Sequence, residues 1–419
     1  MNLISWAIPF FLLAIVIEWL WGLARSQNTY RLNDAISSLM LGILSQIRKL
    51  LSLGVVAWIY GASVDLIGVR PWSTDALTNW IAAFVLYDLC YYWLHRCSHE
   101  RQILWAAHVA HHQSEDYNLS TALRQTSTGA WFGWIFYLPL FLLGVPAEMF
   151  VTVGALNLIY QFWVHTRHIP ELGPLEWVFV TPSNHRVHHA QNDCYVDTNY
   201  GGVFILWDRV FGTYQAEQVD VPCIYGIRGA IRRFSPWVAL THIYRDIISD
   251  LWHTKSWRNR LRILLARTGW QPDDLPLGVR REKRPLGDFQ RFDPQVGVWA
   301  RAYAFYLLLM MTALLMDTLL LRSTAPMAMH LLVALMLLWT GILAAYYLEG
   351  RRGALMLGAD LARWCLFAWM VMRTEPQATH LLWMVGVGCV LALKTAQTEP
   401  ALEQQTHLSG KEDRRGVQA

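Results

Sequence analysis

The chain has 419 residues, of which 54% are hydrophobic and 22 are tryptophan, and its formal net charge is only +4. This length would hold two or three soluble domains, but so high an apolar fraction indicates a polytopic membrane protein. The small net charge, in a sequence without a recognisable nucleic-acid-binding motif, argues against nucleic acid as a partner.

Apolar segments long enough to cross a bilayer recur along the chain, since a spanning helix needs roughly 20 residues. The predicted spans are residues 3–23, 76–94, 302–321, 329–348, 355–372 and a shorter one at 381–393. Residues 35–60 contain Arg48 and Lys49, so this stretch is either a span with buried charges or an amphipathic segment followed by a short span. Residues 131–163 are apolar on both sides of Gly144 and predict a helical hairpin that enters and leaves on one side. The predicted fold class is therefore all-α, with about seven to nine membrane-embedded helices.

Basic residues indicate the orientation of these spans. Arginines follow the first span and the span at 76–94, crowd the region 228–301, and recur at Arg351 and Arg352. All of them lie on the cytoplasmic side if 35–60 spans and the hairpin is re-entrant. The first apolar segment lacks a basic leader and carries Glu18 late in its run, so we interpret it as an anchor and not as a cleaved signal peptide. We expect an integral protein of the endoplasmic reticulum in a eukaryote, or of the inner membrane in a bacterium.

Composition divides the chain into five segments. Residues 1–75 hold N-terminal membrane helices, 76–218 the histidine-rich core, 219–300 a polar, basic and tryptophan-rich segment, 301–398 the C-terminal spans, and 399–419 a disordered tail. Basic amphipathic helices that contain tryptophan usually lie in the plane of the lipid headgroups, so we expect residues 219–300 to form an interfacial segment.

Ten of the fifteen histidines fall between His95 and His189, in H-x-x-x-H, H-x-x-H-H and H-x-x-H patterns. Helical residues at i, i+3 and i+4 share one face, so each pattern can direct two or three imidazoles at one point. One such pattern is common in ordinary helices, but four in one apolar chain predict a metal site, because neutral imidazole is the commonest metal ligand. The set is too large for one tetrahedral ion and implies two metals, with Zn, Cu, Fe and Ni all open. The six cysteines form no C-x-x-C pair and are interpreted as reduced thiols, with Cys97 and Cys194 as packing residues and not ligands.

Carboxylates near these patterns are candidates for orienting the ligands. A metal-bound histidine generally donates its second ring N–H to a carboxylate, a carbonyl or a water. The candidates are Asp88, Glu100, Glu115, Asp116, Asp197 and Asp208. Asp88 is favoured because a carboxylate inside an apolar span is unusual, and Glu100 directly follows His99. For Glu115, Asp116 and Asp208, loop solvation or helix capping is an equally good interpretation.

Several motifs together resemble the fatty acid hydroxylase and sterol desaturase superfamily. They are H-R-C-S-H-E from His95, W-A-A-H-V-A-H-H-Q from Trp105, S-E-D-Y-N-L-S-T-A-L-R-Q from Ser114, H-T-R-H-I from His165, T-P-S-N-H-R-V-H-H from Thr181 and N-Y-G-G-V-F-I-L-W-D from Asn199. The resemblance covers about residues 31–273. The run from Ser114 and the position of Glu100 are most similar to members that act on alkylglycerol ethers.

The resemblance implies a membrane di-iron oxygenase whose active site faces the cytoplasm. Its metal ligands match His95, His99, His108, His111, His112, His185, His188 and His189. His165 matches a further ligand position, whereas the role of His168 stays open. Glu100, which matches the family's acidic residue, and Asp88 are the candidate catalytic carboxylates. The expected partners are a lipid, O2, a membrane and an electron donor, with tetrahydrobiopterin as the reductant on the resemblance alone.

The expected reaction is hydroxylation of the ether carbon of an alkylglycerol, which gives a hemiacetal that collapses to a fatty aldehyde. Asn184 replaces a frequent histidine, and Pro170 with Glu171 departs from the usual pattern, which leaves the fine specificity open. Three alternatives remain: hydroxylation or desaturation of a sterol, fatty acyl chain or aminolipid; metal transport, which would place histidines within spans; and zinc hydrolysis, which needs fewer ligands.

Overall fold

The computed structural model describes residues 3–281, 285–321, 325–374 and 382–397, and all regular elements in these ranges are helices. The predicted all-α class is thus confirmed for them. Contacts divide the described chain into two compact units: one contains the residues up to 232 together with 237–292, and the other contains 233–236 and the residues from 293 onward. The segment predicted as a tail, 399–419, lies outside the described residues.

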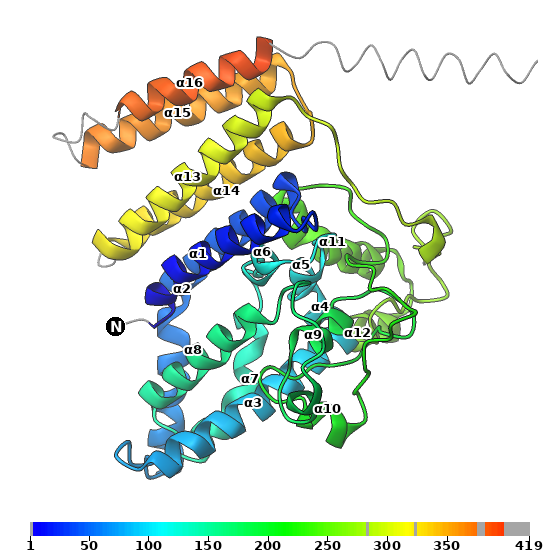
Figure 1. Ribbon diagram of the computed structural model, residues 1–419. Helices are drawn as coiled ribbons and strands as arrows, with labels where there is room; N and C mark the ends of the chain where they lie inside the picture. The colour runs from blue at the N-terminus through cyan, green and yellow to red at the C-terminus, as the bar shows by residue number, and fades with distance from the viewer. Residues whose placement is uncertain (1–2, 282–284, 322–324, 375–381, 398–419) are drawn as a thin grey trace, which may run out of the picture. The chain divides into compact units, whose positions relative to one another are not determined.

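The first unit is built on five long helices: α1 (Leu3–Ala24), α2 (Leu32–Ile67), α3 (Leu77–Glu100), α7 (Ala130–Leu142) and α8 (Ala147–Trp163) (Figure 1). Residues 35–60, for which the sequence allows either one span or two segments, lie within the single 36-residue helix α2. The two helices of the predicted hairpin are present as α7 and α8, while its entry into the membrane remains a prediction. Gly144 joins them at φ +91°, and a Cβ there would lie 2.5 Å from the Arg70 carbonyl oxygen, so only glycine fits this turn.

Helix α3 positions the first histidines. Its apolar N-terminal part packs on α7 and α8 through a core of Ala83, Leu140, Val145, Met149 and Val153. Its last two turns extend beyond this core and carry His95 and His99, which are both buried. Because these residues are one turn apart, their rings lie on the same face of α3.

Most of the other histidines up to His189 lie in or next to short elements, whereas His165 and His168 follow α8. In chain order the short elements are α4 (Gln102–Ala106), α5 (Val109–His112), α6 (Leu119–Ala122), the 3-10 helix η1 (Gly173–Trp177), α9 (Pro182–His188) and α10 (Leu206–Phe211). Helices α6 and α9 begin with capping boxes, at Asn118 with Thr121 and at Thr181 with Asn184. These caps satisfy amides that would otherwise stay unpaired in a buried region.

The basic segment of the first unit contains α11 (Pro236–His253) and α12 (Trp257–Leu265), followed by the 3-10 helix η2 (Leu286–Asp288). Ile247 of α11 and Ile263 of α12 pack with Ala106 in one buried cluster. On the outer side, Trp252 and Trp257 are exposed. Both helices are therefore amphipathic, as the sequence predicts, while their position in a lipid headgroup layer remains a prediction.

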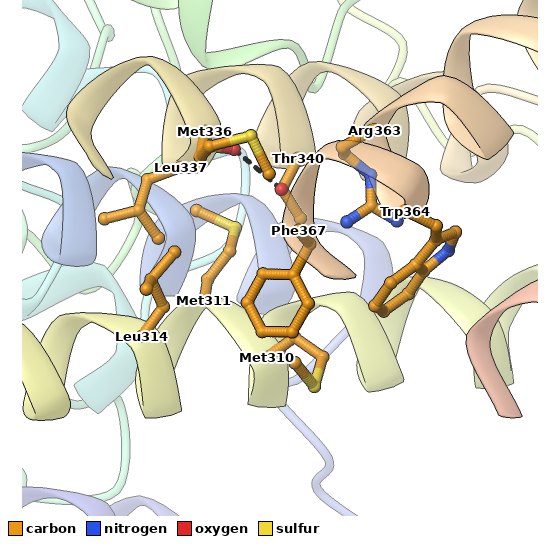
Figure 2. A pocket seen from close by; sticks show the side chains of 9 residues that line it. All are labelled: Met310, Met311, Leu314, Met336, Leu337, Thr340, Arg363, Trp364 and Phe367. Atoms are coloured by element: carbon orange, nitrogen blue, oxygen red, sulfur yellow. Dashed lines mark hydrogen bonds between the residues drawn. The ribbon is translucent and has the colours of Figure 1, made fainter. Parts of the chain in front are cut away.

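The second unit contains α13 (Val298–Leu321), α14 (Met327–Leu348), α15 (Ala354–Thr374) and α16 (Leu382–Gln397). Its core holds a buried ion pair between Asp360 and Arg363 at 2.7 Å, and Asp360 also accepts a hydrogen bond from the Tyr303 hydroxyl at 2.6 Å. Arg363 and Thr340 line a small pocket together with methionine, leucine and aromatic side chains (Figure 2).

Four helices in the described ranges are long and apolar enough to cross a membrane: Trp6–Ala24, Val298–Leu319, Met327–Leu348 and Ala354–Met372. They coincide with four of the predicted spans. The predicted spans at 76–94 and 381–393 also form helices, α3 and α16, but neither belongs to this set; the second is among the shorter apolar helices.

Candidate metal centre

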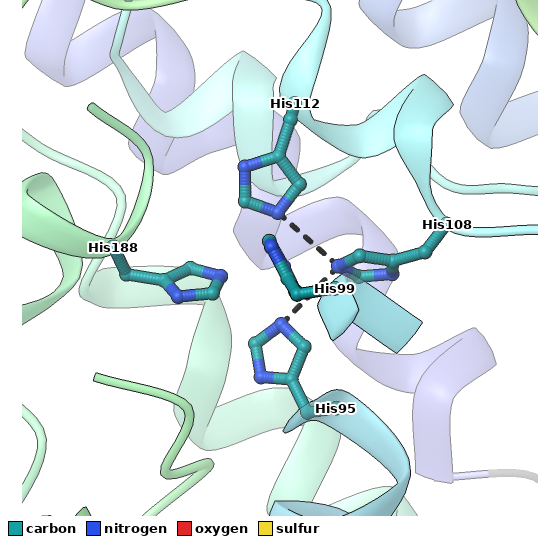
Figure 3. A group of neighbouring side chains, drawn as sticks. All are labelled: His95, His99, His108, His112 and His188. Carbon is teal, nitrogen blue, oxygen red and sulfur yellow. Dashed lines mark hydrogen bonds between the residues drawn. The ribbon is translucent and has the colours of Figure 1, made fainter. Parts of the chain in front are cut away.

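Nine histidine side chains converge in two groups. The first group contains His95, His99, His108, His112 and His188, and the second contains His111, His165, His185 and His189. Within each group, one ring nitrogen of every member lies within 4.8 Å of those of the others. Figure 3 shows the first group converging from several directions. The structure thus brings together all nine predicted ligands, and His168 belongs to neither group.

The H-x-x-H-H motifs connect the two groups. From the motif at 108–112, His108 and His112 join the first group and His111 joins the second. The motif at 185–189 is divided the other way, because His188 joins the first group whereas His185 and His189 join the second. The stacked rings of His112 and His189, one from each group, have centroids only 4.3 Å apart. The two groups are therefore adjacent, as a two-metal centre requires.

Backbone carbonyls orient four of the rings. The Nδ1 atoms of these rings lie 2.7–3.0 Å from carbonyl oxygens: His95 from Tyr200, His111 from Arg124, His165 from Gln161 and His188 from Thr198. Because a carbonyl only accepts, each Nδ1 carries the proton and each Nε2 presents its lone pair. The expectation that carboxylates would orient these rings is wrong for all four. A carbonyl fixes the same tautomer without adding a charge to the buried site.

The Nε2 lone pairs of these rings face one another inside each group. Their separations show whether a cation fits between them. In the second group, the Nε2 atoms of His111 and His165 are 3.3 Å apart, although neither neutral ring has a proton there. In the first group, the Nε2 atoms of His99 and His188 are buried without a hydrogen-bond partner among the described residues. Converging lone pairs repel unless a cation lies between them, and metal–imidazole bonds of about 2.0–2.1 Å suit such separations. Both groups therefore fit a metal ion.

Burial keeps these rings neutral. It is the largest cause that lowers the pKa of all nine histidines below the ordinary value, and neighbouring histidines lower the pKa of most of them further. The pKa falls to about 3 for His95 and about 4 for His111. Protons consequently do not compete for these nitrogens near neutral pH, and the lone pairs stay available to a cation.

Asp88 does not reach a histidine ring. Its buried carboxylate accepts hydrogen bonds from the amides of Val203 and Phe204 at 2.8 and 3.0 Å, from the Trp207 indole at 3.0 Å and from the Asn157 amide at 2.6 Å. These bonds attach the loop after Tyr200 to α3 and α8. These partners favour a positioning role for Asp88 over the catalytic role expected from the sequence.

Two other carboxylates are likewise paired with groups of the protein. Glu100 pairs with Arg96, one turn earlier on α3, at 2.9 Å. Asp208 accepts from the amides of Tyr200 and Gly201 at 2.7 and 2.8 Å, so it holds the loop whose Tyr200 carbonyl orients His95. Burial raises the pKa of Asp208 to about 6.

Asp34, at the start of α2, was missed by the reasoning from sequence. Its carboxylate accepts from the Ser114 hydroxyl and from the amides of Glu115 and Asp116, at 2.8, 3.0 and 3.1 Å, and lies 3.6 Å from Arg124. Arg124 in turn orients His111 through its carbonyl. In the sequence, Asp34 looks like any acidic residue in the first turn of a helix, and only the fold brings it to the segment that follows Ser114.

Known proteins match this histidine-rich region. The fatty acid hydroxylase family model matches residues 80–213, which include all nine grouped histidines. The chain is 40% identical to human alkylglycerol monooxygenase over 282 residues, which are 66% of this chain and 62% of that protein. It is 37% identical to the Xenopus tropicalis protein of that name over 72% of this chain and 66% of the relative, and 37% identical to the Danio rerio one over 81% and 77%.

The chain therefore belongs to the fatty acid hydroxylase family, in the group of the alkylglycerol monooxygenases. It spans somewhat less than two thirds of the length of the human relative. No solved structure matches the chain significantly.

Proposed function

We propose that this chain is an O2-dependent di-iron monooxygenase that hydroxylates the ether carbon of alkylglycerols and so releases a fatty aldehyde. The observation that carries the proposal is the pair of adjacent histidine groups in a chain 37% identical to Danio rerio alkylglycerol monooxygenase over 77% of that protein. An all-imidazole ligand set suits iron, although other first-row metals share this preference.

The residues of the chain have three tasks in this proposal. The five-histidine and four-histidine groups each hold one iron, and the carbonyls of Tyr200, Arg124, Gln161 and Thr198 fix the rings. Burial of the rings excludes bulk water from the centre. When bound, the irons supply the oxidising power for inserting one atom of O2 into a C–H bond. Glu100, next to His99, remains the candidate catalytic carboxylate.

The reaction balances with a two-electron donor. One oxygen atom of O2 enters the C–H bond beside the ether oxygen, and the other leaves as water after taking up two electrons and two protons. The product is a hemiacetal, whose C–O bond breaks to give a fatty aldehyde and a free glycerol hydroxyl. We propose tetrahydrobiopterin as the electron donor on the strength of the family relationship.

We further propose that the chain is embedded in a membrane by about seven to nine helices, with both histidine groups in a cap on the cytoplasmic side. Four helices of sufficient length and hydropathy support this, and none of the nine histidines lies in them. The same observation disfavours a metal transporter, whose ligands would line the spans. Within this arrangement, residues 76–218 form the catalytic core and 219–300 the interfacial segment.

The test is metal analysis of the detergent-purified protein, followed by O2-dependent conversion of an alkylglycerol in the presence of tetrahydrobiopterin. We expect two irons per chain and release of fatty aldehyde. Iron without aldehyde would reject the ether substrate and direct the assay to sterols, fatty acyl chains and aminolipids. Zinc in protein from iron-replete cells, with no O2 consumption, would reject the oxygenase altogether.

A further inference from the structure

Glu18 is a buried carboxylate on a largely exposed apolar helix. Large side chains of α1 such as Phe10 and Ile17 are 69% and 58% exposed, whereas Glu18 is only 7% exposed. The helix is also one of the four that could cross a membrane. A carboxylate in such a segment is costly and usually has a specific partner or function. Glu18 plays no part in the ligand set described above.

Three segments of the first unit converge on this carboxylate. It accepts hydrogen bonds from the Tyr30 hydroxyl, from the backbone amide of Leu119 at 2.8 Å and from the Thr166 hydroxyl. Tyr30 follows α1, Leu119 begins α6, and Thr166 follows α8. The carboxylate therefore joins α1 to two elements that are distant from it in sequence.

Both distant elements lead directly to the four-histidine group. Thr166 is the residue after His165, and its carbonyl accepts a hydrogen bond from Arg186, on the helix that carries His185, at 3.1 Å. Helix α6 leads to Arg124, whose carbonyl orients His111. Glu18 thus holds the segments that set the 3.3 Å separation between the Nε2 atoms of His111 and His165. Its hydrogen bonds do not reach α3, which supplies two ligands of the five-histidine group.

We infer that Glu18 is a positioning residue for the metal ion of the four-histidine group. In this inference α1 helps to hold the metal ligands in place, in addition to anchoring the chain. The inference rests on the proposed function only in that the four-histidine group binds a metal. It requires no particular lipid substrate. Loss of Glu18 should therefore weaken one of the two metal sites selectively.

The test is titration of the metal-free, full-length protein in detergent with Co2+, which counts ions without reference to turnover. We expect wild-type protein to bind two ions, and Glu18→Ala to bind one with unchanged affinity and the other at least tenfold more weakly. Glu18→Gln should retain more affinity, because its amide oxygen can accept from the Leu119 amide while its NH2 donates to the Thr166 hydroxyl. Glu148→Ala, at an exposed carboxylate of α8, should match wild type.

Two further comparisons separate positioning from general destabilisation. Thr166→Val removes one hydroxyl with almost no change of shape and should weaken the same ion, whereas Thr166→Ser should not. The loss caused by Glu18→Ala should disappear in a His165→Ala background and persist in a His95→Ala background. Equal weakening of both ions, or two ions bound by Glu18→Ala with wild-type affinity, would overturn the inference. Wild-type protein that binds two ions but releases no aldehyde would reject the proposed function and leave this inference standing.

Discussion

The Nδ1 atom of His95 lies 2.8 Å from the backbone carbonyl oxygen of Tyr200, which is 105 residues later in the chain. The loop that provides this carbonyl is held by two buried carboxylates, Asp208 at its start and Asp88 just beyond. The ligand ring, the carbonyl and the carboxylates therefore form successive layers. The carboxylates influence the metal by fixing the backbone, which makes their effect separable from that of the ligands.

Replacing Asp88 should loosen this backbone. Asp88→Ala leaves two buried and two partly buried donors without an acceptor, and Asp88→Asn turns one acceptor atom into a donor that faces donors. We expect either change to lower the free energy of unfolding by ~2–4 kcal/mol and to reduce metal retention. Thermal unfolding and metal analysis would measure both effects. Asp75→Asn, at an exposed carboxylate before α3, serves as the control. Wild-type stability and metal content in both Asp88 variants would contradict the positioning role.

Ligand substitutions should distinguish the two histidine groups. We expect His188→Ala to lose the ion of the first group and His111→Ala that of the second, each with at least a hundredfold loss of turnover and unchanged membrane insertion. His168→Ala, which removes a histidine outside both groups, should keep both ions and full turnover. Metal analysis, membrane fractionation and the aldehyde assay test this set. A His111 or His188 variant that kept both the metal content and the turnover of wild type would disprove the assignment.

Acid should destabilise the metal-free protein steeply. The nine histidines have a folded-state pKa below the ordinary 6.5, so below pH 6.5 the unfolded chain takes up protons that the folded chain does not. Stability is therefore complete above about pH 6.5 and falls as the pH drops toward 4, by up to ~1.4 kcal/mol per pH unit for each such ring. Unfolding temperatures at pH 7.5, 6.5 and 5.5 would show the loss.

The metal-loaded protein is the control for this acid effect. Bound ions add their binding free energy to the folded state, so the loaded form should lose much less stability over the same pH range. Identical pH profiles with and without metal would show that the buried rings are not the source of the acid sensitivity.

The sequence predicts the ligands of this site better than their grouping. The i, i+3 and i+4 spacing operates within one helix, so the motifs alone indicate that the rings of His108 and His112 can meet. The assignment of the chain neighbour His111 to the second group depends on how the fold brings the distant His165, His185 and His189 to it, which spacing does not encode. The carbonyl partners and Asp34 come from distant segments, and nothing in their local sequence distinguishes them. Hydropathy likewise predicts the helix positions but not that α2 continues through Arg48 and Lys49.

Helix α12 should lie in the headgroup layer of an anionic membrane. Trp257, Leu261 and Leu265 follow one another at intervals of four residues, and each is about two thirds exposed. Arg258 and Arg262 flank this apolar stripe on one side and Arg260 on the other, which suits insertion among anionic lipids.

The test is a nitroxide label at Leu261→Cys, in protein that lacks the exposed Cys194 and Cys365 and is held in anionic nanodiscs. This label should collide more often with O2 than with a water-soluble nickel complex. The same label at Asp273→Cys, an exposed position beyond α12, should show the reverse preference. A nickel-accessible label at position 261 would place this helix in water.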